Sequence, residues 1–273
     1  MTPEGNVAAR NDALLRWYGE ERRQLPWRSD GDPYVTLVSE AMLQQTQVER
    51  VIPKYLEFME RWPTAEDLAS SDPSELLAVW SGLGYNARAL RLRESAVKVA
   101  EIGWPRSPGE LQTLPGVGPY TAAAISAIAF GDRVAAVDTN LRRVISRWEG
   151  LPLSGRDLDE AADALVTDPA GDWNQALMDL GAMVCRPRNP KCTECPVSDW
   201  CANPGVYEPP PRQSSFEGSA RQLRGALVRA NLAGENLLDT GVSLGRRQPE
   251  VEEAISALTA EGLLPASSPR SST

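Results

Sequence analysis

Hydrophobic residues recur along this chain at intervals of three and four, the spacing that places them on one face of an α-helix. The pattern is clear in residues 14–18, 35–42 and 76–80, and it returns in residues 223–227 and 251–258. Alternation of polar and apolar positions, which is typical of strands, is rare. The pattern therefore predicts an all-α fold with short connections.

Four prolines, each preceded by a short polar residue, mark helix starts. The pairs are Asp32-Pro33, Asp72-Pro73, Ser107-Pro108 and Asp168-Pro169. Aspartate and serine are good N-cap residues, and proline suits the first helical turn because it has no N–H to leave unpaired. We therefore expect all four prolines in first-turn positions.

The composition changes towards the C-terminus. Residues 205–215 are rich in proline and serine and predict an extended linker, whereas residues 216–265 return to helical spacing. The pattern indicates a small C-terminal helical module, for which a winged-helix-like fold is one interpretation. We expect the tail, residues 266–273, to be disordered.

The overall composition is that of a globular protein, since 42% hydrophobic residues in a chain of 273 suffice for one or two buried cores. A net charge of -9 argues against a broadly basic nucleic-acid-binding surface, so any DNA-binding face must be local. No segment has the length of a membrane span, and the N-terminus lacks a signal-peptide pattern. We therefore expect a cytoplasmic protein.

The scarcity of two residue types narrows the chemistry. The chain has no histidine, which removes the commonest general base and the commonest metal ligand. It has only three lysines, Lys54, Lys98 and Lys191. Acid–base chemistry must therefore fall mainly to Asp, Glu, Tyr or Cys.

All four cysteines lie in one segment with the spacing C-x6-C-x2-C-x5-C, at Cys185, Cys192, Cys195 and Cys201. Thiolates this close can converge on one metal centre, and an all-thiolate set suits zinc or an iron–sulfur cluster. Zinc ribbons usually supply two C-x2-C pairs and this segment has one, so the spacing favours a 4Fe-4S cluster. Disulfides are a further alternative, although they are rare in the cytoplasm.

Three basic residues, Arg186, Arg188 and Lys191, lie between the first two cysteines. They favour a phosphate contact at this loop if the protein binds DNA. The alternative is a solvated surface loop without a ligand.

Residues 114–121 have the sequence Leu-Pro-Gly-Val-Gly-Pro-Tyr-Thr and lie between two helical runs. Two glycines in a tight turn, followed by proline, expose backbone N–H groups at the positive end of a helix dipole. Such a turn can hold a DNA phosphate without a basic side chain, through Leu114, Gly116, Val117 and Gly118. A plain turn between two helices is the alternative.

Two carboxylates have no partner nearby in the sequence that explains them. Glu40 lies in an apolar helical stripe with no opposite charge three or four residues away, so we expect a raised pKa that suits a general acid. Its alternative position is the water-facing edge of the stripe. Asp138 follows an apolar run and precedes a helix, which makes it a natural N-cap. An ionised aspartate could also stabilise a sugar cation during cleavage of a glycosidic bond.

These residues together resemble the helix-hairpin-helix superfamily of DNA glycosylases, and most closely the MutY family of adenine-specific mismatch glycosylases. The similarity extends from about residue 25 to residue 201 and favours an iron–sulfur cluster over zinc. The matching stretches are Leu25–Arg28, Ser39–Gln47, Gly82–Tyr85, Leu114–Gly118, Val137–Asn140, Asn174–Gly181 and the four cysteines.

The resemblance implies a two-lobed helix-hairpin-helix fold with DNA bound between the lobes. Residues 30–132 would form a six-helix lobe that contains the hairpin, and residues 133–204 would form the cluster lobe. The N-terminal helix, within residues 1–29, would pack with the cluster lobe.

The resemblance also implies a mechanism. The target adenine is flipped out of the duplex, Glu40 protonates its N7, and Asp138 stabilises the oxocarbenium ion, with or without a transient covalent adduct. Gln175 would contact the adenine edge, and Asn140 the sugar or a water. The full pocket and wedge set is Arg28, Leu43, Gln45, Thr46, Tyr85, Tyr120, Asn140 and Gln175, of which Gln45 and Tyr85 would wedge beside the opposing base.

Tyr120 predicts a glycosylase that does not cut the DNA strand. Lyase-active relatives have a lysine at this position, whose amine forms a Schiff base with the sugar. We therefore expect a monofunctional enzyme that leaves an abasic site in double-stranded DNA. We also expect it to be a monomer.

Two departures from the family concern the base opposite adenine. The chain lacks sequence for the larger Nudix-like domain that recognises 8-oxoguanine in many members, and its segment at residues 215–222 is similar to the short module of some bacterial members. Asn86 replaces a second tyrosine. A thymine or uracil mismatch glycosylase and a catalytically silent iron–sulfur DNA-binding protein are the alternatives, and the presence of both Glu40 and Asp138 favours the adenine enzyme.

Overall fold

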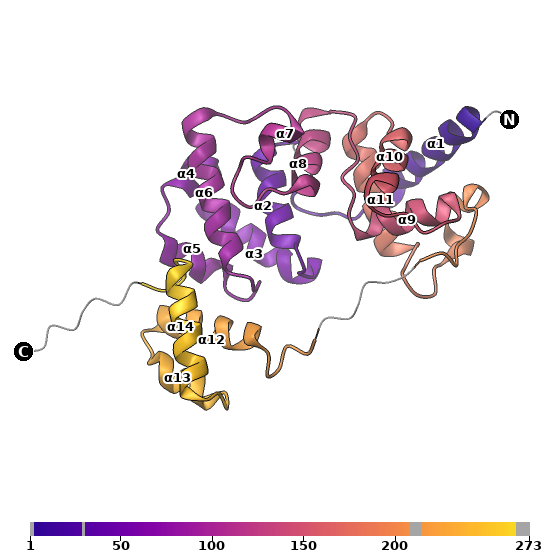
Figure 1. Ribbon diagram of the computed structural model, residues 1–273. Helices are drawn as coiled ribbons and strands as arrows, with labels where there is room; N and C mark the ends of the chain where they lie inside the picture. The colour runs from indigo at the N-terminus through magenta and orange to yellow at the C-terminus, as the bar shows by residue number, and fades with distance from the viewer. Residues whose placement is uncertain (1–2, 29–30, 208–213, 266–273) are drawn as a thin grey trace, which may run out of the picture. The chain divides into compact units, whose positions relative to one another are not determined.

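The computed structural model describes residues 3–28, 31–207 and 214–265, and within them it contains helices and turns but no strand. The all-α prediction is confirmed (Figure 1). Residues 208–213 of the predicted linker and the predicted disordered tail lie outside the described residues. The elements are α1 (Pro3–Glu21), α2 (Pro33–Leu43), α3 (Val48–Arg61), α4 (Ala65–Ala69), α5 (Pro73–Trp80), α6 (Ala87–Ile102), α7 (Pro108–Leu111), α8 (Pro119–Ile125), the π-helix η1 (Ser126–Phe130), α9 (Thr139–Glu149), α10 (Gly155–Leu165), α11 (Ala170–Met183), the 3-10 turns η2 (Cys192–Glu194) and η3 (Ser198–Trp200), α12 (Ala220–Ala233), α13 (Leu237–Ser243) and α14 (Gln248–Ala260).

The predicted helix starts are confirmed at three of the four prolines. Pro33, Pro73 and Pro108 are the first residues of α2, α5 and α7. Pro169 is different, because it occupies the cap position before α11. Its ψ of 122° is extended, so it lies outside the first turn and the prediction is wrong there.

The chain divides into two compact units. The first comprises residues 1–40 and 102–211, and the second comprises residues 41–101 and 212–273. The lobe boundaries expected from the sequence stay predictions. In both units, residues of the predicted site lie on or next to helices that pack against other helices.

In the first unit, α11 is the central helix. It packs against both α1 and α9, and α9 also contacts α10 (Figure 1). Trp173 of α11 is fully buried in a core that contains Leu14 of α1 and Ile145 of α9. Gly181 permits the close approach of α11 and α9, because a Cβ at this position would lie 2.6 Å from the Cβ of Asn140.

The second unit has an aromatic core and includes the C-terminal helices. The ring of Phe58 contacts Trp62 and Trp80 edge-on, at centroid distances of 5.0 and 6.5 Å. Helices α12, α13 and α14 pack against one another, and α12 contacts α5. Residues 214–265 form no strands, so the winged-helix interpretation is wrong for these residues, which have no wing.

Candidate active site and cysteine cluster

Glu40 lies near the end of α2 and is buried, with only 8% of its surface exposed. Burial raises its pKa to about 7, because the charged form loses its hydration. A hydrogen bond from the Tyr120 hydroxyl and the charge of Arg28 act in the opposite direction, whereas the Asp138 carboxylate raises the pKa further. The predicted raised pKa is confirmed, and a carboxyl with this pKa can donate a proton at neutral pH.

Asp138 is the N-cap of α9, as predicted. Its Oδ1 accepts hydrogen bonds from the backbone N–H of Asn140 at 2.8 Å and of Leu141 at 2.7 Å. The Asn140 side chain donates to Oδ2 at 2.8 Å. Burial raises the pKa of Asp138, and these three hydrogen bonds oppose that rise by stabilising the ionised form.

A line of hydrogen bonds joins Asp138 to the cysteine segment. The amide of Asn140 donates to Asp138, and the Asn140 Oδ1 accepts from the buried Arg143 guanidinium at 2.8 Å. Arg143 also donates through Nε to the carbonyl of Cys185 at 2.7 Å. The position of Asp138 therefore depends on the backbone that carries the first cysteine.

Arg28 is held by a buried aspartate on α11. Its two terminal nitrogens lie 2.6 and 2.8 Å from the two carboxylate oxygens of Asp179, a bidentate pair that fixes the plane of the guanidinium. Arg23 binds the same carboxylate through Nε at 2.6 Å. Arg28 is therefore rigid, and its positive charge acts on Glu40.

Gln175 is oriented by a tyrosine from α1. The hydroxyl of the buried Tyr18 donates to Gln175 Oε1 at 2.8 Å, which defines the oxygen end of the amide. The guanidinium of Arg28 lies 5.8 Å from the centre of the Tyr18 ring, within the range of a cation–π contact. Tyr18 thus contacts two of the predicted pocket residues of this unit, Arg28 and Gln175.

The glycine turn before α8 has the expected form. Gly116 has a φ of 77°, which favours glycine, and Gly118 is the N-cap of α8, with Pro119 in the first turn. Leu114 and Val117 are buried beneath the turn, and the Val117 amide donates to the Leu114 carbonyl at 3.1 Å. No side chain caps α8 within the described structure, so no side chain competes with a phosphate for the N–H groups of its first turn.

The remaining predicted pocket and wedge residues belong to the second unit. Leu43 is the last residue of α2 and is partly buried. Gln45 and Tyr85 are exposed, and both have a positive φ, of 57° and 50°. Thr46, next to Gln45, is linked to the chain just before Tyr85, because its hydroxyl donates to the Leu83 carbonyl at 3.3 Å.

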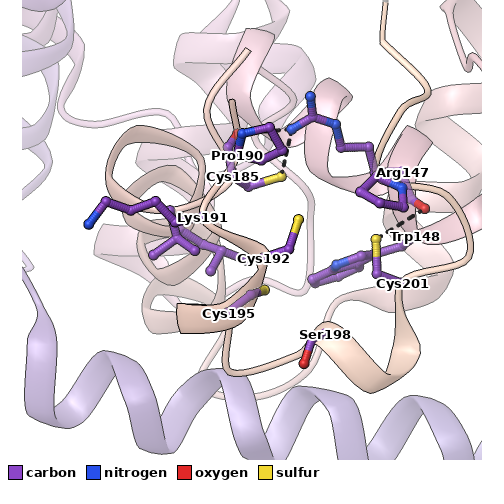
Figure 2. A pocket seen from close by; sticks show the side chains of 12 residues that line it. Arg147, Trp148, Cys185, Pro190, Lys191, Cys192, Cys195, Ser198 and Cys201 are labelled. Atoms are coloured by element: carbon purple, nitrogen blue, oxygen red, sulfur yellow. Dashed lines mark hydrogen bonds between the residues drawn. The ribbon is translucent and has the colours of Figure 1, made fainter. Parts of the chain in front are cut away.

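The four cysteines line one pocket, and Figure 2 shows their sulfur atoms around a common space. None of them is in a disulfide, so that alternative is wrong. Arg147, buried on α9, donates to the Cys185 Sγ at 3.1 Å, and the Cys201 thiol faces the carbonyl of the same arginine. The buried positive charge of Arg147 would stabilise a metal centre that, with its thiolate ligands, carries a net negative charge.

A single zinc ion is the alternative to a cluster at these cysteines. A zinc ion with Zn–S bonds of about 2.3 Å would draw its thiolates to within about 4 Å of one another. Among the described residues, no three Cys, Asp or Glu side chains are placed to hold one metal ion. A cluster that gives each cysteine its own iron atom needs wider spacing. Arg147 Nε is also buried without a partner in the described structure, as expected beside a negatively charged group.

The basic residues of the cysteine loop are accessible. Arg186 and Arg188 are exposed, whereas Lys191 is partly buried and pairs with Glu194 at 2.7 Å. This loop thus presents two arginines to solvent, and its phosphate role stays a prediction.

Sequence reasoning missed the residues that hold the predicted ones. These are Tyr18, Arg88, Arg143, Arg147 and Asp179. Asp179 gave the clearest signal, because it is a single charge within the apolar helical run 176–183. Tyr18 belongs to the apolar stripe of residues 14–18, which predicts its burial but not its partner. The three arginines look like ordinary surface positions in the sequence, and only their distant partners reveal them.

Comparison with protein families defines the class. Residues 38–165 match the HhH-GPD superfamily of base excision DNA repair proteins, and residues 185–201 match the iron-sulfur binding domain of endonuclease III. The four cysteines of the second match are therefore the ligands of a 4Fe-4S cluster.

The relatives define the family more narrowly. The adenine DNA glycosylase of Mycolicibacterium smegmatis is 40% identical over 272 residues, which cover 92% of this chain and 91% of that protein. The human adenine DNA glycosylase is 46% identical over 215 residues, and the chain spans 39% of its length. The chain belongs to the adenine DNA glycosylase family.

Solved structures agree on the fold. A thermostable thymine-DNA glycosylase is 34% identical, with a TM-score of 0.68 over 74% of this chain and 98% of that one. An endonuclease III trapped on DNA is 21% identical, with a TM-score of 0.62 over 75% of this chain and 98% of that one. The second similarity concerns the fold alone. Along the described part of the chain, no helix has the length and apolarity needed to cross a membrane.

Proposed function

We propose that this protein is a monofunctional DNA glycosylase that excises adenine mispaired with 8-oxoguanine or guanine. The observation that carries the proposal is the buried Glu40, with its pKa raised to about 7, close to a second carboxylate on Asp138. Excision of a purine needs one group that donates a proton and one that stabilises positive charge on the sugar. Glu40 and Asp138 supply these two groups.

The reaction begins with protonation of the base. Protonated Glu40 donates to N7 of the flipped adenine, which makes the base a better leaving group. The bond between C1′ and N9 then breaks, and its electron pair leaves with the adenine. Glu40 becomes ionised, and the Tyr120 hydroxyl and Arg28 stabilise its new charge.

The sugar cation is stabilised by Asp138. The backbone hydrogen bonds to Asp138 hold one of its carboxylate oxygens in place before the substrate arrives, so little reorganisation is needed. Water adds to C1′ and gives up a proton to the solvent, which yields an abasic site and free adenine. Asn140, already bonded to Asp138, is placed to contact the sugar or this water.

Binding of the flipped base is assigned to the rigid groups around Glu40. Arg28 is held by Asp179, and Gln175 is held by Tyr18, so both present fixed hydrogen-bonding groups. The N-terminus of α8 and the exposed Arg186 and Arg188 would bind phosphates of the duplex. Gln45 and Tyr85 are proposed to wedge beside the opposing base.

The cluster would be held by Cys185, Cys192, Cys195 and Cys201, and it would supply a structural anchor for the loop that bears the arginines. Arg147 and Arg143 tie that loop to α9 through the Cys185 sulfur and carbonyl. The same helix begins at Asp138.

Base release under single-turnover conditions tests the proposal. Duplexes with A:8-oxoG, A:G, T:G and U:G pairs are incubated with cluster-loaded protein, with Glu40→Gln as the control. We expect adenine release by the wild type only, and strand cleavage only after alkali, because Tyr120 provides no amine for a Schiff base. Strand cleavage without alkali would contradict the monofunctional assignment.

The similarity to a thymine-DNA glycosylase makes thymine release the second candidate. Thymine has no basic ring nitrogen equivalent to N7, so a buried proton donor such as Glu40 favours adenine. Release of thymine but not adenine would overturn the substrate assignment, and no release from any duplex would favour a silent DNA-binding protein.

A further inference from the structure

Two exposed residues of the second unit have backbone conformations that are uncommon for side chains other than glycine. Gln45 follows α2 with a φ of 57°, and Tyr85 precedes α6 with a φ of 50°. Such residues are conformationally strained, and they persist only where the surrounding structure holds them. We name residues 44–46 and 82–85 the first and second wedge segments.

One side chain, Arg88 of α6, binds both wedge segments. Its Nη1 donates to the carbonyls of Ala41 at 2.7 Å and Gln44 at 2.6 Å, at the C-terminus of α2 and the start of the first segment. Its Nη2 donates to the carbonyls of Leu83 at 3.2 Å and Gly84 at 3.1 Å in the second segment. Nη2 also lies 3.5 Å from the Thr46 hydroxyl oxygen in the first segment, so the planar guanidinium binds both segments at once.

The packing around Arg88 fixes its position. The guanidinium carbon lies 5.5 Å from the centre of the Trp80 ring and 5.4 Å from the centre of the Tyr85 ring. Trp80 is fully buried and donates through its indole nitrogen to the Gly84 carbonyl at 3.1 Å. The arginine thus connects an exposed aromatic ring to the core of the unit.

The second wedge segment depends on these contacts because three of its four residues have a positive φ. Gly82 and Gly84 have φ values of 98° and 74°, and Tyr85 follows in the same left-handed region. With these left-handed residues, the carbonyls of Leu83 and Gly84 accept hydrogen bonds from Arg88 and do not take part in a helix or a sheet. Without the guanidinium, the carbonyls of Leu83 and Gly84 would lose a charged donor and Tyr85 could leave its strained conformation.

We propose that Arg88 is a positioning residue that holds Gln45 and Tyr85 together as one rigid wedge for entry into the DNA base stack. The inference rests on the proposed function, since it assigns the two exposed residues a role on duplex DNA. Arg88 itself contacts neither the base nor the reacting atoms. It acts through the two wedge segments, and pre-ordering them removes an entropic cost that would otherwise be met during base flipping.

The test compares three variants. Arg88→Gln removes the guanidinium and its two terminal donor nitrogens. Arg88→Lys keeps the positive charge and serves as the second variant in case Arg88→Gln does not fold. Lysine has one nitrogen at its end, so it cannot bind the two segments with the geometry of a guanidinium. Arg93→Gln is the matched control, because Arg93 lies on the same helix and also donates to a carbonyl, that of Ser71 at 2.8 Å, outside both wedge segments.

The first measurement reports wedge insertion without chemistry. Each variant is made with Glu40→Gln, and a duplex carries 2-aminopurine next to the base opposite the target adenine. At saturating protein, the fluorescence rise that reports unstacking is expected to fall severalfold with Arg88→Gln and Arg88→Lys and to persist with Arg93→Gln. An unchanged rise with both Arg88 variants would overturn the proposal.

The second measurement separates positioning from general damage. Single-turnover adenine release from a paired duplex is compared with release from a duplex in which an abasic analogue replaces the opposing base. We expect Arg88→Gln to slow release roughly 10–100-fold on the paired duplex, as misplaced positioning groups do, and much less opposite the abasic analogue. Equal loss on both substrates would overturn the proposal. If the wild type releases no base at all, the proposed function fails, and the fluorescence measurement still decides the role of Arg88.

Discussion

Replacement of Glu40 by glutamine should stabilise the protein at alkaline pH while it removes the proposed general acid. Burial raises the pKa of Glu40 from an ordinary value of 4.5 to about 7, so the folded state favours the protonated form. A carboxyl whose folded pKa is raised contributes stability below its unfolded pKa, and this contribution is lost as the pH rises through the folded pKa. Glutamine keeps a similar shape and hydrogen-bond acceptor but does not ionise.

The two pKa values of Glu40 give the magnitude of the effect. Between an unfolded pKa near 4.5 and a folded pKa near 7, the loss amounts to about 3 kcal/mol once the pH is well above 7. At pH 5 less than about 1 kcal/mol has been lost. The variant should therefore gain about 2 kcal/mol on the wild type between pH 5 and pH 8.5. For a protein of this size that corresponds to about 4–8 °C in the apparent melting temperature.

Scanning calorimetry or fluorescence-monitored melting at pH 5 and pH 8.5 measures this difference. Scan rates must be equal, because the apparent melting temperature of a protein that unfolds irreversibly depends on the scan rate. Glu49→Gln, at an exposed position on α3, is the control and should show no pH-dependent gain. The reasoning is refuted if Glu40→Gln changes the melting temperature equally at both pH values, or if it destabilises the protein more at pH 8.5.

Three further predictions concern the candidate active site and the cysteine cluster. Tyr120→Phe removes a hydrogen bond that lowers the pKa of Glu40, so the alkaline limb of the rate–pH profile should move up by about one pH unit, and a limb that stays in place or moves down would contradict the assignment. Cys195→Ser should abolish the visible absorption of the purified protein and its iron content, and a variant that retains both would show that Cys195 is not a ligand. Tyr18→Phe frees the amide of Gln175 to rotate, and single-turnover adenine release should slow about 5–10-fold with the cluster content unchanged, since one neutral hydrogen bond is worth about 1 kcal/mol.

The helices and their starts could be predicted because their determinants are local. Asp72 and Ser107 cap the helices that follow them, through hydrogen bonds to N–H groups two or three residues away. Asp138 is found by the same rule, since an apolar run, a capping residue and a helix are adjacent in the sequence. Pro169 shows the limit of the rule, because a proline fits the cap as well as the first turn and only its ψ distinguishes the two.

Glu40 could be predicted for a related reason. Glu40 shares a helical face with Thr36 and Leu37, which are buried, so its carboxyl loses solvent when that face packs. The sequence could not predict how far its pKa would move, because Tyr120, Asp138 and Arg28 act on it from three distant segments. Local pattern thus identifies the acid, and tertiary contacts set its strength.

The arginines show most clearly what the sequence alone does not predict. Arg88 and Arg93 lie five residues apart on α6, and the helical spacing around them predicts no partner for either side chain. The structure gives Arg93 one carbonyl at Ser71, whereas it gives Arg88 carbonyls from two separate segments and two aromatic rings. Because a guanidinium carries five donors, its role depends on how many chain segments converge on it, which is a property of the fold. Two partly buried arginines of one helix can therefore look alike in a helical pattern and still differ in function.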